Sequence, residues 1–387
     1  MAWYWIILVV GIVPWLALGS MLVVTRRRVL DLPDGSWSDH PLVSVICPAR
    51  NEADELESAM RSRLSDPSDR LEFILVDDRS TDSTGAIMDS LASEDDRIQV
   101  VRVEELPEGW LGKVHAEQRG LDRARGDWIL FSDSDVHLRP GLVASAMAWA
   151  RQQDADHVAL IPRIDGGPWI MRACLPVMIL VLTASTRLWR ANDDSADRAM
   201  GVGAFNLVRR SALERAGGLE RLRMEIVDDV GIGTIVRRSG GRSRLAVAID
   251  RLSVRWYRST RDFLQGMEKG AAKAGGRFSL TLKSVGLLVS TLVLLVPFLL
   301  PSLWAGAPVS AEVVALLGGG LAILTGLLAA ARFGYSWPWA LVLPVGLVLT
   351  MLVGQRSLWL ALLRGGVRWR GDQLSLESAI EGEQVKL

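Results

Sequence analysis

Leu71-Glu-Phe-Ile-Leu-Val-Asp-Asp-Arg-Ser-Thr-Asp82 is an apolar, β-branched run that ends in a cluster of polar residues. Similar runs recur along the first half of the chain, and each predicts a short buried strand: Leu42–Cys47, Glu72–Val76, Ile98–Val103, Trp128–Ser132 and His157–Ile161. Between them, the segments Glu52–Leu64, Ser83–Ala92 and Val114–Ala124 have helical spacing. This alternation predicts an α/β fold with a mostly parallel sheet that is covered on both faces.

The polar clusters come where the predicted strands end. Pro48-Ala-Arg-Asn-Glu52 follows the first run, Asp77-Asp78 follows the second, and Asp133-Ser-Asp135 follows the fourth. Ligands of such sheets bind at the carboxyl ends of the strands. We therefore expect carboxylates from three strand ends to gather at one edge of the sheet.

The chain also carries four stretches without any charged residue, which span 3–24, 284–311, 313–331 and 333–355. A helix needs about 20 apolar residues to cross a bilayer, so these stretches predict an integral membrane protein. Arg26, Arg27 and Arg28 follow the first stretch and predict that this end faces the cytoplasm. A shorter apolar segment, 173–186, suits an interfacial helix, with a buried core helix as the alternative.

Composition excludes several other classes of protein. The span 25–283 has a net charge of −1, so no basic excess points to nucleic acid. Cys47 and Cys174 supply neither a disulfide framework nor a metal quartet. Gly112-Lys113 is followed by Val114, so a Walker-type phosphate loop is missing.

Two pairs of acidic residues are the first candidates for chemistry. Asp133 and Asp135 are oxygen ligands of the kind that Mg²⁺ or Mn²⁺ shares with substrate phosphates, although an Asp-x-Asp pair is also common in solvated turns. Asp77 and Asp78 suit the ribose or base of a nucleotide, or the cap of the next helix. For Asp82 the capping role is the favoured interpretation.

Taken in order, the strand ends and Gly109-Trp-Leu-Gly-Lys113 form a specific pattern over residues 42–140. The pattern resembles the family 2 inverting glycosyltransferases, which have a GT-A fold, and the resemblance extends to about residue 275. It implies that Pro48, Ala49, Glu52 and Asp78 line the uracil and ribose of a nucleotide sugar. It also implies that Lys113 lies near the diphosphate, which Asp133 and Asp135 hold through the metal.

The acceptor half of the resemblance begins at Gly201-Val-Gly-Ala-Phe-Asn206 and continues to Glu225-Ile-Val-Asp-Asp229. Family members usually have Glu-Asp at the last two positions, and the second acid is the catalytic base. The resemblance therefore assigns Asp229 as the base and Asp228 as its neighbour, and like charges in a pair raise one pKa toward neutrality. The alternative is that both acids cap the next helix.

The chain departs from the processive polysaccharide synthases of the family, because it lacks their Gln-x-x-Arg-Trp motif. The equivalent region carries Arg255, Arg258 and Lys269, which suit either the leaving diphosphate or lipid head groups. Trp256, Tyr257, Trp369 and the cluster Tyr335–Trp339 suit the bilayer interface.

Gly109–Lys113, the N-terminal anchor and Arg368-Trp-Arg-Gly371 are similar to the hopene-associated and ceramide-glucosyltransferase-like members, which glycosylate membrane lipids. This implies a nucleotide-sugar donor, UDP-linked, and a hopanoid, carotenoid, sphingolipid or similar lipid as acceptor. The rival functions are a processive polysaccharide synthase, a nucleotidyltransferase, and a membrane scaffold that binds nucleotide sugar without turnover.

The predicted organisation has four parts: an anchor at 1–25, a cytoplasmic GT-A domain at 40–275, transmembrane helices at 284–365 and a polar tail at 366–387. Four full crossings from an outside N-terminus would also place the C-terminus outside. Arg364, Arg368 and Arg370 instead favour a cytoplasmic end. The sequence leaves this conflict open, and a cytoplasmic tail is the favoured interpretation.

Overall fold

The computed structural model describes residues 2–37, 41–268, 277–303, 309–369 and 372–375. Within these residues the chain forms two compact units. One is an α/β unit made of Val29–Asp165 and Arg190–Trp256. The other is a helical unit made of the described parts of Met1–Arg28, Gly166–Trp189 and Tyr257–Glu381. The predicted domain limit of 40–275 stays a prediction.

A seven-stranded sheet in the order β3-β2-β1-β4-β8-β6-β9 forms the centre of the α/β unit. Neighbouring strands are parallel except that β8 runs antiparallel to both β4 and β6. A smaller sheet has the order β5-β10-β7. The strands are β1 Val43–Ala49, β2 Leu71–Asp78, β3 Ile98–Val103, β4 Trp128–Phe131, β5 Val136–Leu138, β6 His157–Ile161, β7 Arg163–Ile164, β8 Asn206–Arg209, β9 Ser243–Val247 and β10 Leu252–Val254.

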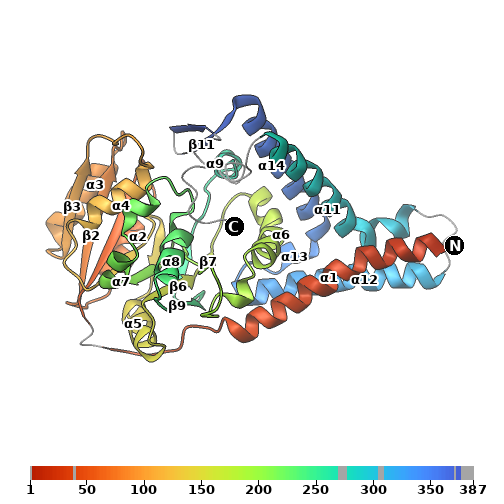
Figure 1. Cartoon of the computed structure of the whole chain (residues 1–387), viewed down its shortest axis with the longest axis horizontal. Helices are drawn as coiled ribbons and strands as arrows, with labels where there is room; N and C mark the ends of the chain where they lie inside the picture. Colours follow the sequence, from red (N-terminus) through yellow and green to blue (C-terminus); the bar gives the residue numbers. More distant parts are fainter. Residues whose placement is uncertain (1, 38–40, 269–276, 304–308, 370–371, 376–387) are drawn as a thin grey trace. The chain divides into compact units, whose positions relative to one another are not determined.

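Every residue of β1 and β2 is buried, and both strands are mostly apolar for that reason, with Ser44, Glu72, Asp77 and Asp78 as buried polar exceptions. The outer strand β3 instead alternates buried and exposed positions. Helices flank the large sheet (Figure 1), and they are α2 Leu56–Leu64, α3 Thr84–Glu94, α4 Gly112–Leu121, α5 Leu142–Gln152, α7 Arg210–Arg215 and α8 Asp228–Arg238. The predicted mostly parallel, two-sided sheet is confirmed, and each of the five predicted strands is present.

The opposite edge strand, β9, is covered by the chain that enters the unit. Leu32 N–H donates to Val247 O at 2.8 Å, and Val247 N–H donates to Leu30 O at 3.0 Å. This short parallel bridge satisfies backbone groups that an open edge would leave exposed.

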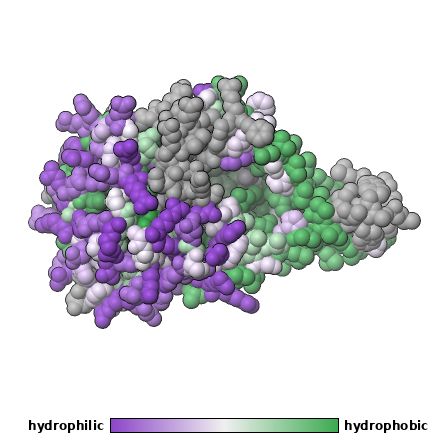
Figure 2. All heavy atoms as spheres, in the orientation of Figure 1, coloured by the Kyte–Doolittle hydropathy of each residue, from purple (hydrophilic) through white to green (hydrophobic). Residues whose placement is uncertain are grey.

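The helical unit contains four helices that are long and apolar enough to cross a membrane: Val9–Arg28, Ser279–Leu299, Val309–Phe333 and Leu343–Arg364. Figure 2 shows hydrophobic residues over this unit and mostly hydrophilic residues over the α/β unit. Its elements are α1 Ala2–Arg28, α6 Trp169–Ser185, α9 Thr260–Gly266, α11 Arg277–Leu303, α12 Val309–Phe333, α13 Pro338–Leu341, α14 Leu343–Arg364, β11 Gly366–Trp369 and β12 Asp372–Ser375. The four predicted apolar stretches thus have helical counterparts.

The last of these helices continues nine residues beyond the charge-free stretch that ends at 355. Arg356 does not end it, because its guanidinium donates to Glu268 Oε1 at 2.9 Å and to Leu264 O at 3.1 Å. Arg364 donates to the other oxygen of Glu268 at 2.8 Å. A buried carboxylate shared by two arginines lowers the cost of placing charge at the end of an apolar helix.

The short apolar segment forms α6, which packs against α14. Gly346 of α14 lies against the backbone of Ala173, where a larger side chain would not fit. Its interfacial placement stays a prediction.

Candidate active site

The Asp133–Asp135 loop follows β4 and is fixed by groups from distant parts of the chain. Asp133 N–H donates to Gly203 O at 2.9 Å, and Ser132 Oγ donates to Ala204 O at 2.8 Å. From α2, the buried guanidinium of Arg63 donates to Val136 O and to Asp133 O. The loop therefore has little freedom to move when charge is placed next to it.

Lys113, in the first turn of α4, joins the two halves of the site. Its Nζ lies 3.0 Å from Asp133 Oδ1 and 2.8 Å from Asp228 Oδ2. Glu117, one turn further along α4, places Oε1 3.7 Å from the same nitrogen. The structure thus places two acids against the ammonium group of Lys113. They are Asp133, predicted on the donor side, and Asp228, the predicted neighbour of the base.

Glu117, Asp228 and most of the Lys113 side chain are buried, and the pKa values of Lys113 and Glu117 are shifted. Burial alone lowers the pKa of Lys113, but Asp133 and Asp228 outweigh it, and the pKa is raised well above its usual value. Burial and the neighbouring Asp228 raise the pKa of Glu117 well above the usual value of a carboxyl. Asp228 lies closer to the Lys113 ammonium than Glu117 does, at 2.8 Å against 3.7 Å.

Asp229, the predicted base, lies in the first turn of α8. Its Oδ2 accepts the N–H of Gly203 at 2.9 Å, and its Oδ1 accepts the N–H of Val230 at 2.8 Å. Both acids lie where the helix dipole favours negative charge. The capping interpretation and the catalytic one are therefore compatible, because a carboxylate oxygen that accepts a backbone N–H has a second lone pair that can take a proton.

Gly203 links this base to the predicted metal ligand. Its N–H binds Asp229, its carbonyl accepts from Asp133, and a Cβ at this position would lie 2.5 Å from Asp133 Oδ2. A close approach of backbone to a carboxylate explains a glycine here.

On the nucleotide side, Asp78 is buried at the end of β2 and accepts from Arg79 Nε at 2.8 Å. Asp77 is occupied by Arg102 and by the N–H of Ser80, which gives it a structural role. Pro48 and Ala49 are buried at the end of β1. Glu52 donates its N–H to Thr84 Oγ1 at 2.8 Å, which ties the first polar cluster to the second.

The N–H of Thr84, the first residue of α3, donates to Asp82 Oδ1 at 2.9 Å, although the N-cap position itself belongs to Ser83, which makes no side-chain cap bond.

The predicted basic residues are not all placed at this site. Arg255 pairs with Glu55 at 3.1 Å within the α/β unit. Arg258 belongs to the helical unit, and Lys269 lies outside the described residues. Their roles toward a diphosphate stay predictions.

The donor set suits a hard divalent cation that is held jointly with a diphosphate. Asp133 and Asp135 supply two half-exposed carboxylates from one fixed loop, and Mg²⁺ commonly uses one or two carboxylates plus phosphate oxygens. Among the described residues, no three or more His, Cys, Asp or Glu side chains are grouped for an all-protein metal site. A metal here would therefore depend on the substrate for its remaining ligands.

Sequence reasoning missed Arg63, Glu117 and Gly203. Glu117 stands four residues after Lys113 in a helical pattern, so the i, i+4 spacing was a readable signal. Arg63 and Gly203 had no comparable signal, since their partners lie between 26 and 73 residues away.

Comparison with known proteins matches residues 44–217 to the family described as glycosyl transferase family 2. A 4,4'-diaponeurosporenoate glycosyltransferase of Staphylococcus haemolyticus is 35% identical over 199 residues, which cover 51% of this chain and 52% of that protein. A GalNAc(5)-diNAcBac-PP-undecaprenol beta-1,3-glucosyltransferase of Campylobacter jejuni is 33% identical over 112 residues, covering 29% of this chain and 35% of that one. The chain thus spans about half the length, or less, of these curated relatives.

A solved structure of the mannosyltransferase PcManGT from Pyrobaculum calidifontis, in complex with GDP-Man and Mn²⁺, superposes with a TM-score of 0.51. It is 19% identical in sequence and covers 92% of this chain and 99% of its own. At this identity the likeness establishes the fold. The large sheet with its flanking helices is of the GT-A type.

Proposed function

We propose, from the glycosyl transferase family 2 domain that this chain carries over residues 44–217, that it is a membrane-bound inverting glycosyltransferase. It moves a sugar from a UDP-linked nucleotide sugar to a lipid hydroxyl, and it uses Mg²⁺ or Mn²⁺. One observation carries the proposal: Lys113 lies within 3.0 Å of both Asp133 and Asp228. The loop proposed to bind the donor and Asp228, the neighbour of the proposed base Asp229, are then close enough to act on one substrate.

In the proposed reaction, Asp229 accepts the proton of the acceptor hydroxyl as its oxygen bonds to the anomeric carbon. The bond between that carbon and the diphosphate breaks on the opposite face, the electron pair leaves with the diphosphate, and the configuration inverts. The N–H groups of Gly203 and Val230 hold the carboxylate in one orientation. A carboxylate held in one orientation keeps the base in line with the acceptor hydroxyl, and such alignment lowers the barrier of the reaction.

Lys113 supplies positive charge for the departing diphosphate. Asp133 and Asp135 would hold the metal ion, which supplies Lewis-acid neutralisation of the phosphate oxygens. Pro48, Ala49, Glu52 and Asp78 are proposed to line the nucleoside, while Arg255 and Arg258 are proposed to neutralise the diphosphate. These groups act mainly by stabilising charge that develops in the transition state.

The lipid acceptor is supported by the four candidate membrane helices and by relatives whose names include undecaprenol and diaponeurosporenoate. A catalytic domain carried on membrane helices meets lipids at a far higher concentration than dilute soluble acceptors. We propose that this domain faces the cytoplasm, because Arg26, Arg27 and Arg28 end the first membrane helix.

The test uses the full chain in detergent with UDP-glucose, UDP-galactose, UDP-N-acetylglucosamine or GDP-mannose, a bacterial total lipid extract and Mn²⁺ or Mg²⁺. Nucleotide release that requires the extract would support a lipid transferase. Asp229→Asn should lower kcat by about 10³-fold with donor binding retained. Asp69→Asn is the matched control, because the Asp69 side chain is 91% exposed.

Two results would contradict the proposal. If turnover is unaffected by Asp229→Asn, Asp229 is not the catalytic base. If the protein binds the nucleotide sugars but releases nucleotide from none of the four donors, the rival function of a membrane scaffold without turnover is favoured.

A further inference from the structure

Three polar side chains lie buried on one face of the large sheet, below α8. They are His157 of β6, Asn206 of β8 and Ser243 of β9, and each is at most 1% exposed. The register explains the grouping: His157 lies opposite Ser243, and Asn206 lies opposite Ala159, two residues along β6. Side chains two residues apart share a face, so the three side chains meet.

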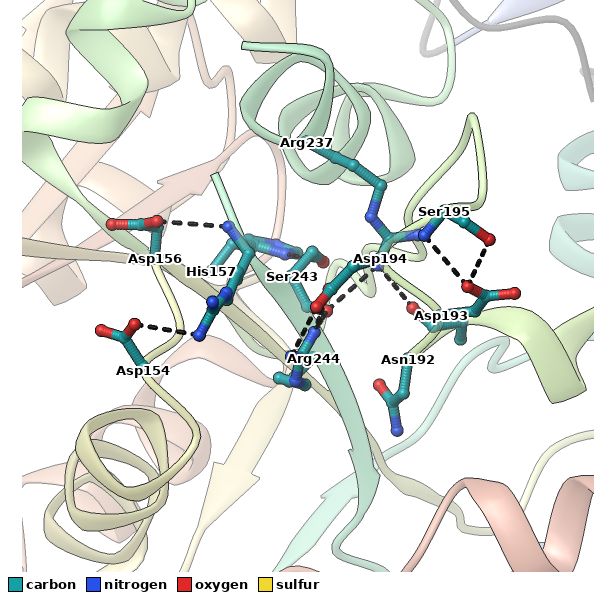
Figure 3. A network of polar contacts seen from close by, with 12 residues as sticks. Asp154, Asp156, His157, Asn192, Asp193, Asp194, Ser195, Arg237, Ser243 and Arg244 are labelled. Atoms are coloured by element: carbon teal, nitrogen blue, oxygen red, sulfur yellow. Dashed lines mark hydrogen bonds and ion pairs between the residues drawn. The ribbon is translucent and has the colours of Figure 1, made fainter. Parts of the chain in front are cut away.

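The hydrogen bonds among them run in one direction. His157 is neutral, because burial lowers its pKa to about 4 despite its bond to Asn206. Its Nδ1 lies 2.7 Å from Ser243 Oγ (Figure 3), and its Nε2 lies 2.5 Å from Asn206 Oδ1. An amide oxygen only accepts, so Nε2 carries the proton and Nδ1 accepts from the serine hydroxyl.

The last bond leaves the sheet. Asn206 Nδ2 donates to the main-chain carbonyl of Asp229 at 3.0 Å, which fixes the orientation of the amide. The sequence of donors is therefore Ser243, His157 and Asn206, and the final acceptor is the backbone of the first turn of α8.

The same helix touches His157 a second time. Gly233, one turn after Asp229, packs on the imidazole so closely that a Cβ would lie 2.8 Å from Cε1. At the other end of α8, Arg237 donates to Ala191 O at 2.6 Å and to Ser243 O at 3.1 Å. The helix that carries Asp229 is thus held to the sheet at both ends by buried polar groups.

We propose that Ser243, His157 and Asn206 form a positioning relay that fixes the backbone of Asp229 and, through it, the direction of its carboxylate. The relay rests on the proposed function only in the role of Asp229 as the base. None of the three residues touches substrate in this proposal. Three apolar side chains of similar volume would fill the same space, but the carbonyl of Asp229 in the first turn of α8 would then lose its hydrogen bond from Asn206.

The sharpest test changes one amide into a carboxylate. Asn206→Asp keeps the shape and the bond from His157, but it places an oxygen against the Asp229 carbonyl. Asn192→Asp is the matched control, because Asn192 Nδ2 donates to the main-chain carbonyl of Leu245 in β9 at the same 3.0 Å, whereas Asn206 Nδ2 donates to the first turn of α8. His157→Gln retains a donor near the position of Nε2, whereas His157→Leu removes it.

Two measurements are made on the full chain in detergent. In turnover with UDP-sugars and bacterial total lipid extract, Asn206→Asp and His157→Leu should lower kcat by about 10- to 100-fold at unchanged donor KM. His157→Gln should recover part of this loss, and Asn192→Asp should show none. In hydrogen–deuterium exchange, the peptides that contain Val230 and Gly203 should exchange faster in Asn206→Asp and His157→Leu only.

The outcomes separate the relay from the proposed function. Unchanged kcat and unchanged exchange in Asn206→Asp would overturn the relay while leaving an active enzyme. A matching loss in Asn192→Asp would overturn it too, since the effect would then be general destabilisation. If the parent protein releases no nucleotide, the proposed function fails, and the exchange of the Val230 peptide still decides whether Asn206 and His157 fix the helix.

Discussion

Gly203 donates its N–H to Asp229 at 2.9 Å, although 26 residues separate the two in sequence. The carbonyl of the same glycine accepts the N–H of Asp133. One residue therefore links the proposed base to the loop proposed to bind the metal, and changes at this residue should affect both.

Gly203→Ala should lower kcat/KM by about 100-fold, because its Cβ would lie 2.5 Å from Asp133 Oδ2 and the loop must shift. Gly35→Ala is the control, since a Cβ there would meet only Ala148 at an ordinary 3.5 Å. Steady-state kinetics of both variants check the prediction. Equal activity of Gly203→Ala and the parent would show that the loop tolerates the displacement.

Asp135→Asn should raise the Mn²⁺ concentration needed for half-maximal activity by about tenfold or more, because one of two carboxylate ligands is lost. A Mn²⁺ titration of nucleotide release measures this shift. Asp133→Asn should also weaken donor binding, since it removes a partner of Lys113 as well. An unchanged titration in Asp135→Asn would remove this residue from the proposed metal site.

Glu117→Gln should remain active within about threefold of the parent at pH 7, because an amide has the shape of a protonated carboxyl. The raised pKa of Glu117 means that the folded state binds a proton that the unfolded state releases above about pH 4.5. Its contribution to the free energy of unfolding is therefore present at low pH and is lost as pH rises through the folded pKa.

Thermal unfolding of the parent and Glu117→Gln between pH 5 and 9 checks this direction. The parent should lose stability with rising pH relative to the variant. Glu57→Gln is the control, because the Glu57 side chain is 54% exposed. Identical pH dependence of parent and Glu117→Gln would mean that Glu117 is ionised in the folded protein.

The lowered pKa of His157 predicts that its contribution to the free energy of unfolding changes with pH in the direction opposite to that of Glu117. Burial lowers its pKa from 6.5 to about 4, and Arg237 on α8 adds to the decrease. Between about pH 6.5 and 4 the unfolded state therefore binds a proton that the folded state does not bind. The contribution of the neutral His157 to the free energy of unfolding is complete above about pH 6.5 and is lost as pH falls toward 4. The loss amounts to roughly 2 kcal/mol by pH 5.

Tryptophan fluorescence during thermal unfolding at pH 7 and pH 5 tests this. The parent should be destabilised by acid more than His157→Gln, since glutamine does not titrate. A larger acid loss in the variant would contradict a neutral, buried His157.

The α/β architecture could be predicted from sequence, because it depends on local patterns, whereas the roles of the site residues stay predictions. Buried central strands such as β2 need apolar runs on both faces, and carboxyl ends of parallel strands share one edge. The resemblance implied that Lys113 and the Asp133 loop lie near one diphosphate, and the structure places Lys113 against both Asp133 and Asp228.

By itself the sequence determined the strands, the apolar helices and the acids at the strand ends, since each of these features depends on residues that are close together in the sequence. Only the tertiary structure decided that burial and Asp228 raise the pKa of Glu117, that Gly203 joins Asp133 to Asp229, and that Asn206 bonds both His157 and α8. These depend on burial and on contacts between segments distant in sequence, such as His157 with Ser243, 86 residues apart. Packing sets both the dielectric around a group and the partners it meets, and no local pattern encodes either.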